Sequence, residues 1–180
     1  RFSKSFFRLS TLLNNGTNRV NLKKPLTWFA IGFGSGLSPL IPGTAGSLLA
    51  SLIFYFLIVP FLRPFAYIFI LCVYVFLVVT SFFFGLYLYK KTMSAEKDAK
   101  IFVWDEFVGM WVATFPLVAF ESFWPWIIVS FVLFRFFDIW KPQPISYFDK
   151  LNSPYGVMMD DVIAGLISAF LLTIALLIFY

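Results

Sequence analysis

Long runs of apolar residues, separated by short polar or proline-containing segments, make up most of the chain after residue 25. A helix that crosses the hydrocarbon core of a bilayer needs about 20 apolar residues, within a range of about 17–25. The stretches that approach or reach this length are residues 47–61, 65–89, 107–120, 124–139 and 162–180. The pattern therefore predicts an all-α, polytopic membrane bundle of about five transmembrane helices. The third and fourth stretches are short, so they form either two spans or one short hairpin.

The segment before the first stretch, residues 32–46, combines glycine, proline, serine and threonine inside an apolar context. Irregular backbone at membrane depth persists only where protein buries it or where it lines a wet cavity. We therefore expect a Gly/Pro-rich re-entrant loop that covers a site, or else a flexible connector or a tight helix-packing patch. Successive N–H groups there can bind an anion, and Thr44 or Ser47 can cap the first helix. The candidate phosphate-binding residues are Gly34, Ser35, Gly36, Ser38, Gly43 and Thr44.

The basic residues fall mainly on one side of this predicted topology. That side carries Lys23, Lys24, Lys90, Lys91, Lys97, Lys100, Arg135, Lys141 and Lys150, and the other carries Arg63. An excess of Lys and Arg marks cytoplasmic loops, so the N-terminus is predicted inside and Tyr180 outside. We expect residues 1–25 to form a basic cytoplasmic N-terminal segment, and residues 26–180 to form a single membrane-embedded domain.

Composition agrees with a membrane protein and excludes several classes of function. The chain is 61% hydrophobic and 13% charged, whereas a soluble domain carries about 25% charged residues. The net charge of +5 indicates contact with anionic membrane lipids, and no basic run suggests nucleic-acid binding. The single cysteine, Cys72, lies in an apolar run, so the chain has neither an internal disulfide nor a thiolate metal site.

Acidic residues gather where three of the predicted helices meet the cytoplasmic face. They are Asp105 and Glu106 before the third span, Asp138 at the end of the fourth, and Asp160 and Asp161 before the fifth. Acids at helix N-termini are also ordinary partners of the helix dipole. Neighbouring residues on a helix project about 100° apart, however, so one acid of each pair must face protein, where an ionisable group is costly. Asp138 lies at the negative end of its helix, where the dipole does not favour an acid.

The residue types around these acids narrow the chemistry. The chain has no histidine, which excludes a phosphohistidine intermediate and a Ser-His-Asp triad. Oxygen ligands without His or Cys favour Mg²⁺ or Mn²⁺. Arg135, Asp138 and Lys141 are spaced three apart, so a continuous helix would place them on one face, either to hold a phosphate or as an ordinary ionic network. We expect metal-assisted attack on phosphorus by water, or else by a carboxylate nucleophile, with the five acids as metal ligands or catalytic groups.

Four motifs in this order closely resemble the bacterial phosphatidylglycerophosphatase A family. They are GFGSGLSPLIPGT at 32–44, VWDEFVGMW at 103–111, FRFFDIWKP at 134–142 and GVMMDDVIAG at 156–165. The resemblance implies a Mg²⁺-dependent inner-membrane enzyme with its active site facing the cytoplasm. It also implies hydrolysis of phosphatidylglycerophosphate to phosphatidylglycerol and phosphate, the last step of phosphatidylglycerol synthesis. It does not assign separate roles to the five carboxylates.

Two other classes of function share some of these features. A small membrane transporter has broken helices and buried acids, but it needs polar groups near the bilayer midplane, where the predicted spans are almost entirely apolar. A lipid phosphotransferase acts at the same interface, but the Asp-Gly…Ala-Arg…Gly…Asp…Asp pattern of phosphatidyltransferases is absent.

Overall fold

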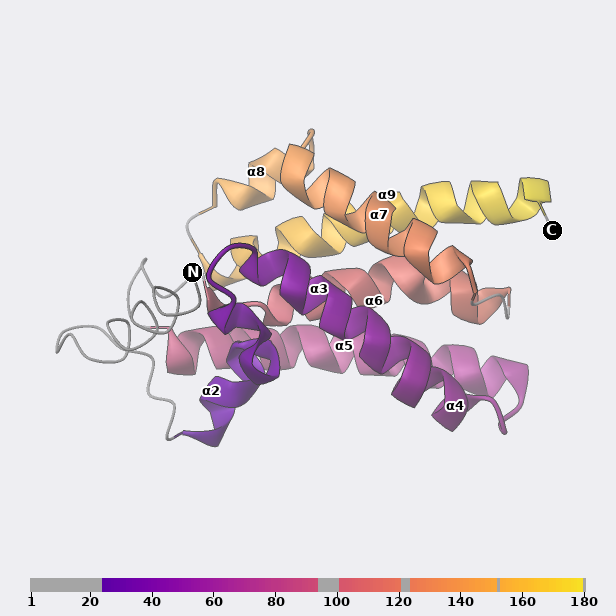
Figure 1. The fold of residues 1–180 in the computed structure, drawn as a ribbon, viewed down its shortest axis with the longest axis horizontal. Coiled ribbons are helices and arrows are strands. Elements are labelled where there is room, and N and C mark those ends of the chain that lie inside the picture. The colour runs from indigo at the N-terminus through magenta and orange to yellow at the C-terminus, as the bar shows by residue number, and fades with distance from the viewer. Residues whose placement is uncertain (1–23, 94–100, 121–123, 152, 180) are drawn as a thin grey trace, which may run out of the picture.

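The computed structural model describes residues 24–93, 101–120, 124–151 and 153–179, and all regular structure in these ranges is helical (Figure 1). Nearly all of the predicted N-terminal segment, residues 1–25, lies outside the described residues. The elements are α2 (Pro25–Ala30), η1 (Gly32–Leu37), α3 (Pro42–Ile53), η2 (Phe54–Ile58), α4 (Val59–Leu62), α5 (Tyr67–Thr92), α6 (Trp104–Ala119), α7 (Trp126–Trp140), α8 (Ile145–Asp149) and α9 (Pro154–Phe179). The all-α prediction is confirmed.

The long helices run along the long axis of the molecule, with α6 at the centre of the bundle (Figure 1). Of the 16 residues of α6, 13 are buried, and the helix packs against α3, α5, α7 and α9. Its neighbours instead expose many large apolar side chains on their outer faces. A helix that is apolar on all sides is a core helix, and apolar outer faces are suited to lipid.

Within the described residues, three helical segments are long and apolar enough to cross a membrane: Pro42–Leu62, Tyr67–Thr92 and Pro154–Phe179. The first runs continuously through α3, η2 and α4, so the short stretch at 47–61 is extended backwards into the glycine-rich segment. Helices α6 and α7, at 1.5 Å per residue, are only about 22–24 Å long, less than a hydrocarbon core of about 30 Å. The structure thus supports a membrane protein but does not confirm five spans.

The last helix begins eight residues earlier than predicted, at Pro154 instead of residue 162. Ser153 accepts a hydrogen bond from the N–H of Gly156 at 3.1 Å, as a helix N-cap does, and Pro154 follows in the first helical position. The sequence Ser-Pro-Tyr-Gly therefore starts a helix, although it suggests a loop. Asp160 and Asp161 consequently lie about two turns inside α9, where they are not caps, and their predicted place at the helix start is wrong.

Two glycines bring α6 and α9 into backbone contact. A Cβ atom at Gly109 would lie 2.7 Å from the carbonyl oxygen of Asp161, and one at Gly165 would collide with the carbonyl oxygen of Gly109. Small residues allow such close approach of membrane helices. Because Gly109 is one turn after Glu106, this contact brings the backbone of Glu106 close to that of Asp161.

The glycine-rich segment folds into helical turns, and the predicted re-entrant loop is not confirmed. In η1, Phe33 and Gly34 have positive φ angles of 53° and 101°, which turn the chain sharply between α2 and α3. A Cβ atom at Gly36 would collide with the carbonyl oxygen of Ile101, so the turn packs against the chain that leads into α6. From Pro42 onwards the segment is already part of α3.

Candidate active site

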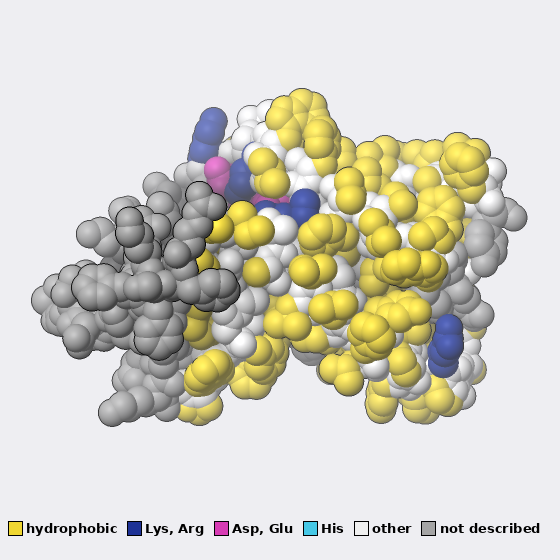
Figure 2. Space-filling view, viewed as in Figure 1, with side chains coloured by type: hydrophobic (Ala, Val, Ile, Leu, Met, Phe, Trp, Pro, Cys, Tyr) yellow, Lys and Arg dark blue, Asp and Glu magenta, His cyan; other side chains and the backbone are white. Residues whose placement is uncertain are grey.

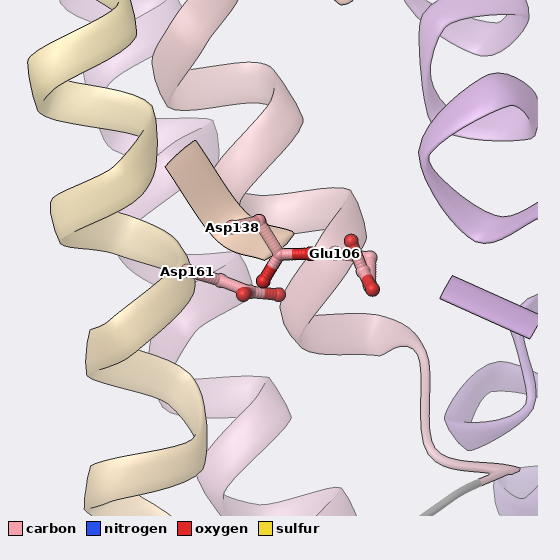
Figure 3. Close-up of side chains that lie close together, drawn as sticks. All are labelled: Glu106, Asp138 and Asp161. Atoms are coloured by element: carbon pink, nitrogen blue, oxygen red, sulfur yellow. The ribbon is translucent and has the colours of Figure 1, made fainter. Parts of the chain in front are cut away.

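Three carboxylates from three different helices meet inside the bundle. Glu106 lies in the first turn of α6, Asp138 in the last turn of α7, and Asp161 in α9. One carboxylate oxygen of each lies within 4.8 Å of those of the other two, and their side chains point toward one another (Figure 3). Each of the three residues is at most 9% exposed. We refer to Glu106, Asp138 and Asp161 as the carboxylate trio.

One cation, Arg135, contacts two members of the trio. Its Nη1 atom pairs with Glu106 and lies 2.8 Å from Oδ2 of Asp138. Arg135 and Asp138 therefore share one face of α7, one helical turn apart. When all three carboxylates are ionised, Arg135 leaves two negative charges uncompensated in a buried place. Such a cluster is costly unless a further cation joins it.

The trio has the donor set of a hard divalent cation. Its ligand atoms are carboxylate oxygens alone, since the chain contains no histidine and its cysteine lies elsewhere, exposed on α5. Mg²⁺ takes one or two carboxylates and completes its coordination with water or substrate phosphate. The residues present therefore fit Mg²⁺, although carboxylates alone do not distinguish it from Mn²⁺.

Ser47 joins the site, and the sequence suggested for it only a capping role. Its buried hydroxyl lies 2.8 Å from Oε2 of Glu106 and accepts a hydrogen bond from Nη1 of Arg135 at 3.2 Å. Helix α3 begins at Pro42 without a side-chain cap, so Ser47 lies more than one turn inside it. A polar residue in an otherwise apolar span was the available signal.

Removing this hydroxyl tests whether Ser47 orients the ion pair. We expect Ser47→Ala to lower kcat/KM for phosphate release about tenfold or more, because a hydrogen bond to a charged group contributes about 1.5–3 kcal/mol. Ser51→Ala is the matched control, since its hydroxyl donates to the carbonyl oxygen of Ser47 and not to the trio. Equal rates for the two variants would exclude this role for Ser47.

A second ionic cluster lies beside the trio. The ammonium of Lys141 lies 2.6 Å from Asp160 and 2.5 Å from Asp149. Burial opposes the charged form, but the hydrogen bonds to Asp149 and Asp160 outweigh it and raise the pKa of Lys141 above its ordinary value. Lys141 therefore stays positively charged and links the end of α7 to α8 and α9. The part that Asp149 plays here was missed, because its sequence position indicates only a loop.

The face shared by Arg135 and Asp138 does not extend to Lys141, because the continuous helix that this would require ends before it. Helix α7 ends at Trp140, and Lys141 has left-handed backbone angles of φ 46° and ψ 54°. The side chain of Lys141 is thereby directed to Asp160 instead of Asp138. The physical reason is the pair of prolines at 142 and 144, which prevent the helix from continuing.

The remaining predicted site residues lie at different distances from the trio. Asp105 accepts a hydrogen bond from the N–H of Glu106 at 2.9 Å and lies within electrostatic range of Asp138 and Asp160. Gly43 lies directly at the cluster, because a Cβ atom there would collide with Oε1 of Glu106 and lie 3.3 Å from Nη2 of Arg135. Thr44 follows it in the first turn of α3.

The four other glycine and serine positions belong to the η1 turn and its exit. Ser35 donates to the carbonyl oxygen of Gly32 at 2.8 Å, and the N–H of Ser38 donates to the carbonyl oxygen of Ser35. A Cβ atom at Gly34 would have Trp28 as its nearest neighbour at 4.0 Å, and Gly36 packs on Ile101. These contacts are structural, so a direct role of the four in phosphate binding stays a prediction.

Comparison with known proteins identifies the family of this chain. Residues 28–176 match the family model described as Phosphatidylglycerophosphatase A. The chain belongs to the phosphatidylglycerophosphatase A family. It is thus a member of a family of phosphatases, and the resemblance noted in its four motifs is confirmed. The match includes all three carboxylates of the trio, together with Arg135 and Ser47.

Individual relatives of the chain support its assignment to this family. The chain is 40% identical to "Phosphatidylglycerophosphatase A" of Escherichia coli (strain K12) over 155 residues, which cover 84% of each protein. It is 42% identical to the Haemophilus influenzae protein of the same name, over 85% of this chain and 90% of the relative. A Bacteroides thetaiotaomicron protein named "Putative phosphatidylinositol-3-phosphatase" is 43% identical over 80% of this chain and 89% of its own length. No solved structure matches the chain.

Proposed function

We propose that this chain is a Mg²⁺-dependent lipid phosphatase that hydrolyses phosphatidylglycerophosphate to phosphatidylglycerol and phosphate. The reaction would complete phosphatidylglycerol synthesis at the cytoplasmic face of the bacterial inner membrane. The observation that carries the proposal is the buried carboxylate trio, which Arg135 compensates only in part. Two of the family relatives carry the name of this activity.

The distribution of charge supports the proposed orientation. On the face shown in Figure 2, all the visible acidic side chains and most of the visible basic ones gather toward one end, a single basic side chain lies at the other, and hydrophobic side chains cover most of the rest. Lys90 and Lys91 in the last turn of α5 reach the same end of the bundle as the start of α6 (Figure 1). The positive-inside rule makes this end cytoplasmic, next to anionic lipids. Residues 1–25 would form a basic segment on that side.

We assign the membrane-embedded domain to residues 26–180 and include α6 and α7 among its about five spans. These two helices are each about 22–24 Å long, which is shorter than the hydrocarbon core. They either cross the membrane while α3, α5 and α9 shield them from lipid, or form a short hairpin within it. A glycine-rich turn before α3 would then lie at the cytoplasmic surface as the cover of the site.

We infer that the substrate phosphate binds beside Arg135 at the start of α3. The N–H groups of Gly43 and Thr44 lie in the first turn of α3, which has no side-chain cap, and a helix N-terminus attracts anions. Nη2 of Arg135 faces Gly43. Backbone donors and a guanidinium thus converge on one place, beside the trio, where the phosphate oxygens of the substrate would bind.

In this proposal, Glu106, Asp138 and Asp161 hold Mg²⁺, and Asp105 and Asp160 support it from the neighbouring positions. Bound Mg²⁺ supplies positive charge that stabilises the charge developing on the transferred phosphoryl group. Arg135 orients the phosphate, and Ser47 holds Arg135 and Glu106 in place. Water attacks phosphorus while a trio or neighbouring carboxylate accepts its proton. The bond between phosphorus and the glycerol oxygen breaks, and the protonated carboxylate returns this proton to the glycerol oxygen, which leaves as the alcohol.

Phosphate release from defined lipids tests the proposal. We expect purified protein in mixed micelles to hydrolyse phosphatidylglycerophosphate with a higher kcat/KM than phosphatidylinositol 3-phosphate or phosphatidic acid. Excess EDTA should lower the rate at least about 1,000-fold, because a catalytic metal contributes several kcal/mol, and added Mg²⁺ should restore it. Hydrolysis that resists EDTA contradicts the metal requirement. Faster release from phosphatidylinositol 3-phosphate would instead assign to this chain the substrate named for its Bacteroides relative.

The same assay separates the two competing functions. A lipid phosphotransferase would pass the phosphoryl group to another alcohol and release little inorganic phosphate. A transporter would show no turnover of lipid, and it needs ionisable groups deep in its spans. Here the described ion pairs involve residues at one end of α6 and α7 and the first part of α9, which favours an interfacial enzyme.

A further inference from the structure

A surface groove of about 390 Å³ lies between the first membrane segment and α7. Leu48, Leu52 and Tyr55 form one wall of it, and Ile127, Ile128 and Phe131 form the other. Leu48, Leu52 and Ile128 are 51%, 44% and 48% exposed, so the groove is open along one side. Its lining is almost entirely apolar, and in a membrane it faces hydrocarbon.

The groove lies next to the candidate active site along the same two helices. On α7, Phe131 lies one turn before Arg135, and on α3, Leu48 and Ser51 follow Ser47. The hydroxyl of Ser51 donates to the carbonyl oxygen of Ser47 at 2.8 Å. In Figure 2, charged side chains lie at one end of the region between α3 and α7, and hydrophobic side chains cover the rest of it. The two helices that flank Arg135 and Ser47 therefore also flank the groove.

The length of the groove corresponds to one leaflet. Ile127 precedes Arg135 by eight residues, and Tyr55 follows Ser47 by eight, so each wall reaches about 12 Å from the charged groups at 1.5 Å per residue. One leaflet of a hydrocarbon core of about 30 Å is about 15 Å deep. The volume is also too small for a helix, which is about 10–12 Å wide with its side chains. An extended alkyl chain fits inside a groove of these dimensions, whereas a whole helix does not.

We propose that this groove binds one acyl chain of the phosphorylated lipid substrate while the phosphate lies at Arg135 and the carboxylate trio. The proposal rests on the proposed lipid phosphatase function and adds the part of the site that recognises the tail. Binding of the acyl chain in the groove, far from the reacting bond, aligns the phosphate with the trio. It also makes KM lower for diacyl lipids than for the water-soluble headgroup alone.

Filling the groove tests the proposal. Leu52→Trp narrows it, whereas Leu177→Trp makes the same change on an exposed position of α9 outside the groove. We expect Leu52→Trp to raise KM for dioleoyl phosphatidylglycerophosphate about tenfold with little change in kcat. The kcat/KM for the deacylated, water-soluble headgroup should stay within about twofold of wild type, and Leu177→Trp should resemble wild type with both substrates.

A second variant and a binding measurement test the groove independently of a folding defect in one variant and of the enzymatic activity. Ile128→Trp narrows the groove from the opposite wall and should give the same KM pattern. A photoreactive diacyl phosphatidylglycerophosphate should label peptides of α3–η2 and α7 more than those of α5, and Leu52→Trp should reduce this labelling. Excess unlabelled phosphatidylglycerophosphate should suppress it more than excess phosphatidylcholine does.

The outcomes separate the two proposals. If wild-type protein hydrolyses both substrates but Leu52→Trp and Leu177→Trp have equal KM for the dioleoyl lipid, the groove proposal is wrong and the phosphatase proposal stands. If wild-type protein releases no phosphate, the phosphatase proposal fails, and the labelling pattern decides the groove. Even labelling of all lipid-facing helices, or equal suppression by phosphatidylcholine, would show that the label reports only ordinary surrounding lipid. Either result overturns the groove proposal.

Discussion

Asp161→Asn is expected to abolish phosphate release and, at the same time, to stabilise the metal-free protein. Asp161 is 3% exposed, and the described ion pairs of Arg135 go to Glu106 and Asp138, not to Asp161. In the metal-free protein its charge therefore adds mainly repulsion and the cost of burial. An asparagine of the same shape removes both the repulsion and the cost of burying the charge, and it breaks no ion pair.

The same substitution removes one oxygen ligand of the proposed Mg²⁺ site. Because the metal stabilises charge on the phosphoryl group by several kcal/mol, we expect kcat/KM to fall at least about 1,000-fold. Relief of like-charge repulsion by about 1 kcal/mol should raise the Tm of the EDTA-treated protein by about 2–4 °C. Loss of activity together with higher stability is typical of a functional site and not of a structural defect.

Phosphate release, Mg²⁺ titration and thermal unfolding in detergent check these expectations. Asp149→Asn is the matched control, since Asp149 also lies in an ionic cluster at this end of the molecule, but its side chain is 47% exposed and outside the trio. It should retain activity within about tenfold of wild type, because an exposed ion pair contributes about 0–1 kcal/mol. Near-normal hydrolysis by Asp161→Asn would remove Asp161 from the active site.

Arg135→Ala is expected to have the largest effect on stability. It leaves Glu106 and Asp138 without their shared cation, in a place where the arginine side chain itself is only 13% exposed. Removing one partner of a buried ion pair costs about 3–5 kcal/mol. Activity should also fall about 1,000-fold, since the guanidinium is the proposed phosphate ligand.

Mg²⁺ distinguishes a charge effect from a simple packing defect in this variant. If the trio binds Mg²⁺, the metal replaces the missing positive charge, and it should raise the Tm of Arg135→Ala more than that of wild type. Arg135→Lys should recover part of the stability but little of the activity. Nη1 of Arg135 alone contacts Glu106, Asp138 and Ser47, which leaves Nη2 for the phosphate, and a lysine ammonium has no second nitrogen. Lys150→Ala, at an exposed basic residue, is the control. An equal response to Mg²⁺ in Arg135→Ala and wild type would contradict metal binding by the trio.

Much of the fold follows from the order of apolar runs. The runs around residues 65–89 and 107–120 correspond closely to α5 and α6, because a long uninterrupted apolar sequence has few alternatives to a helix. The boundaries were less certain. Pro154 and Gly156 suggest a loop but stand at the start of α9, where proline at the first helical position and Ser153 as cap are favourable.

The sequence by itself determined the chemistry that is available: an apolar chain, no histidine, and acids and an arginine within four family motifs. Only the tertiary structure decided which acids meet, because that depends on helix rotation and on close contacts such as Gly109 against α9. It selected Glu106, Asp138 and Asp161, turned Lys141 toward Asp160, and brought Ser47 to a residue 59 positions away. Side-chain spacing predicts a shared face within one helix, but contacts between helices depend on how their surfaces pack, which no local pattern contains.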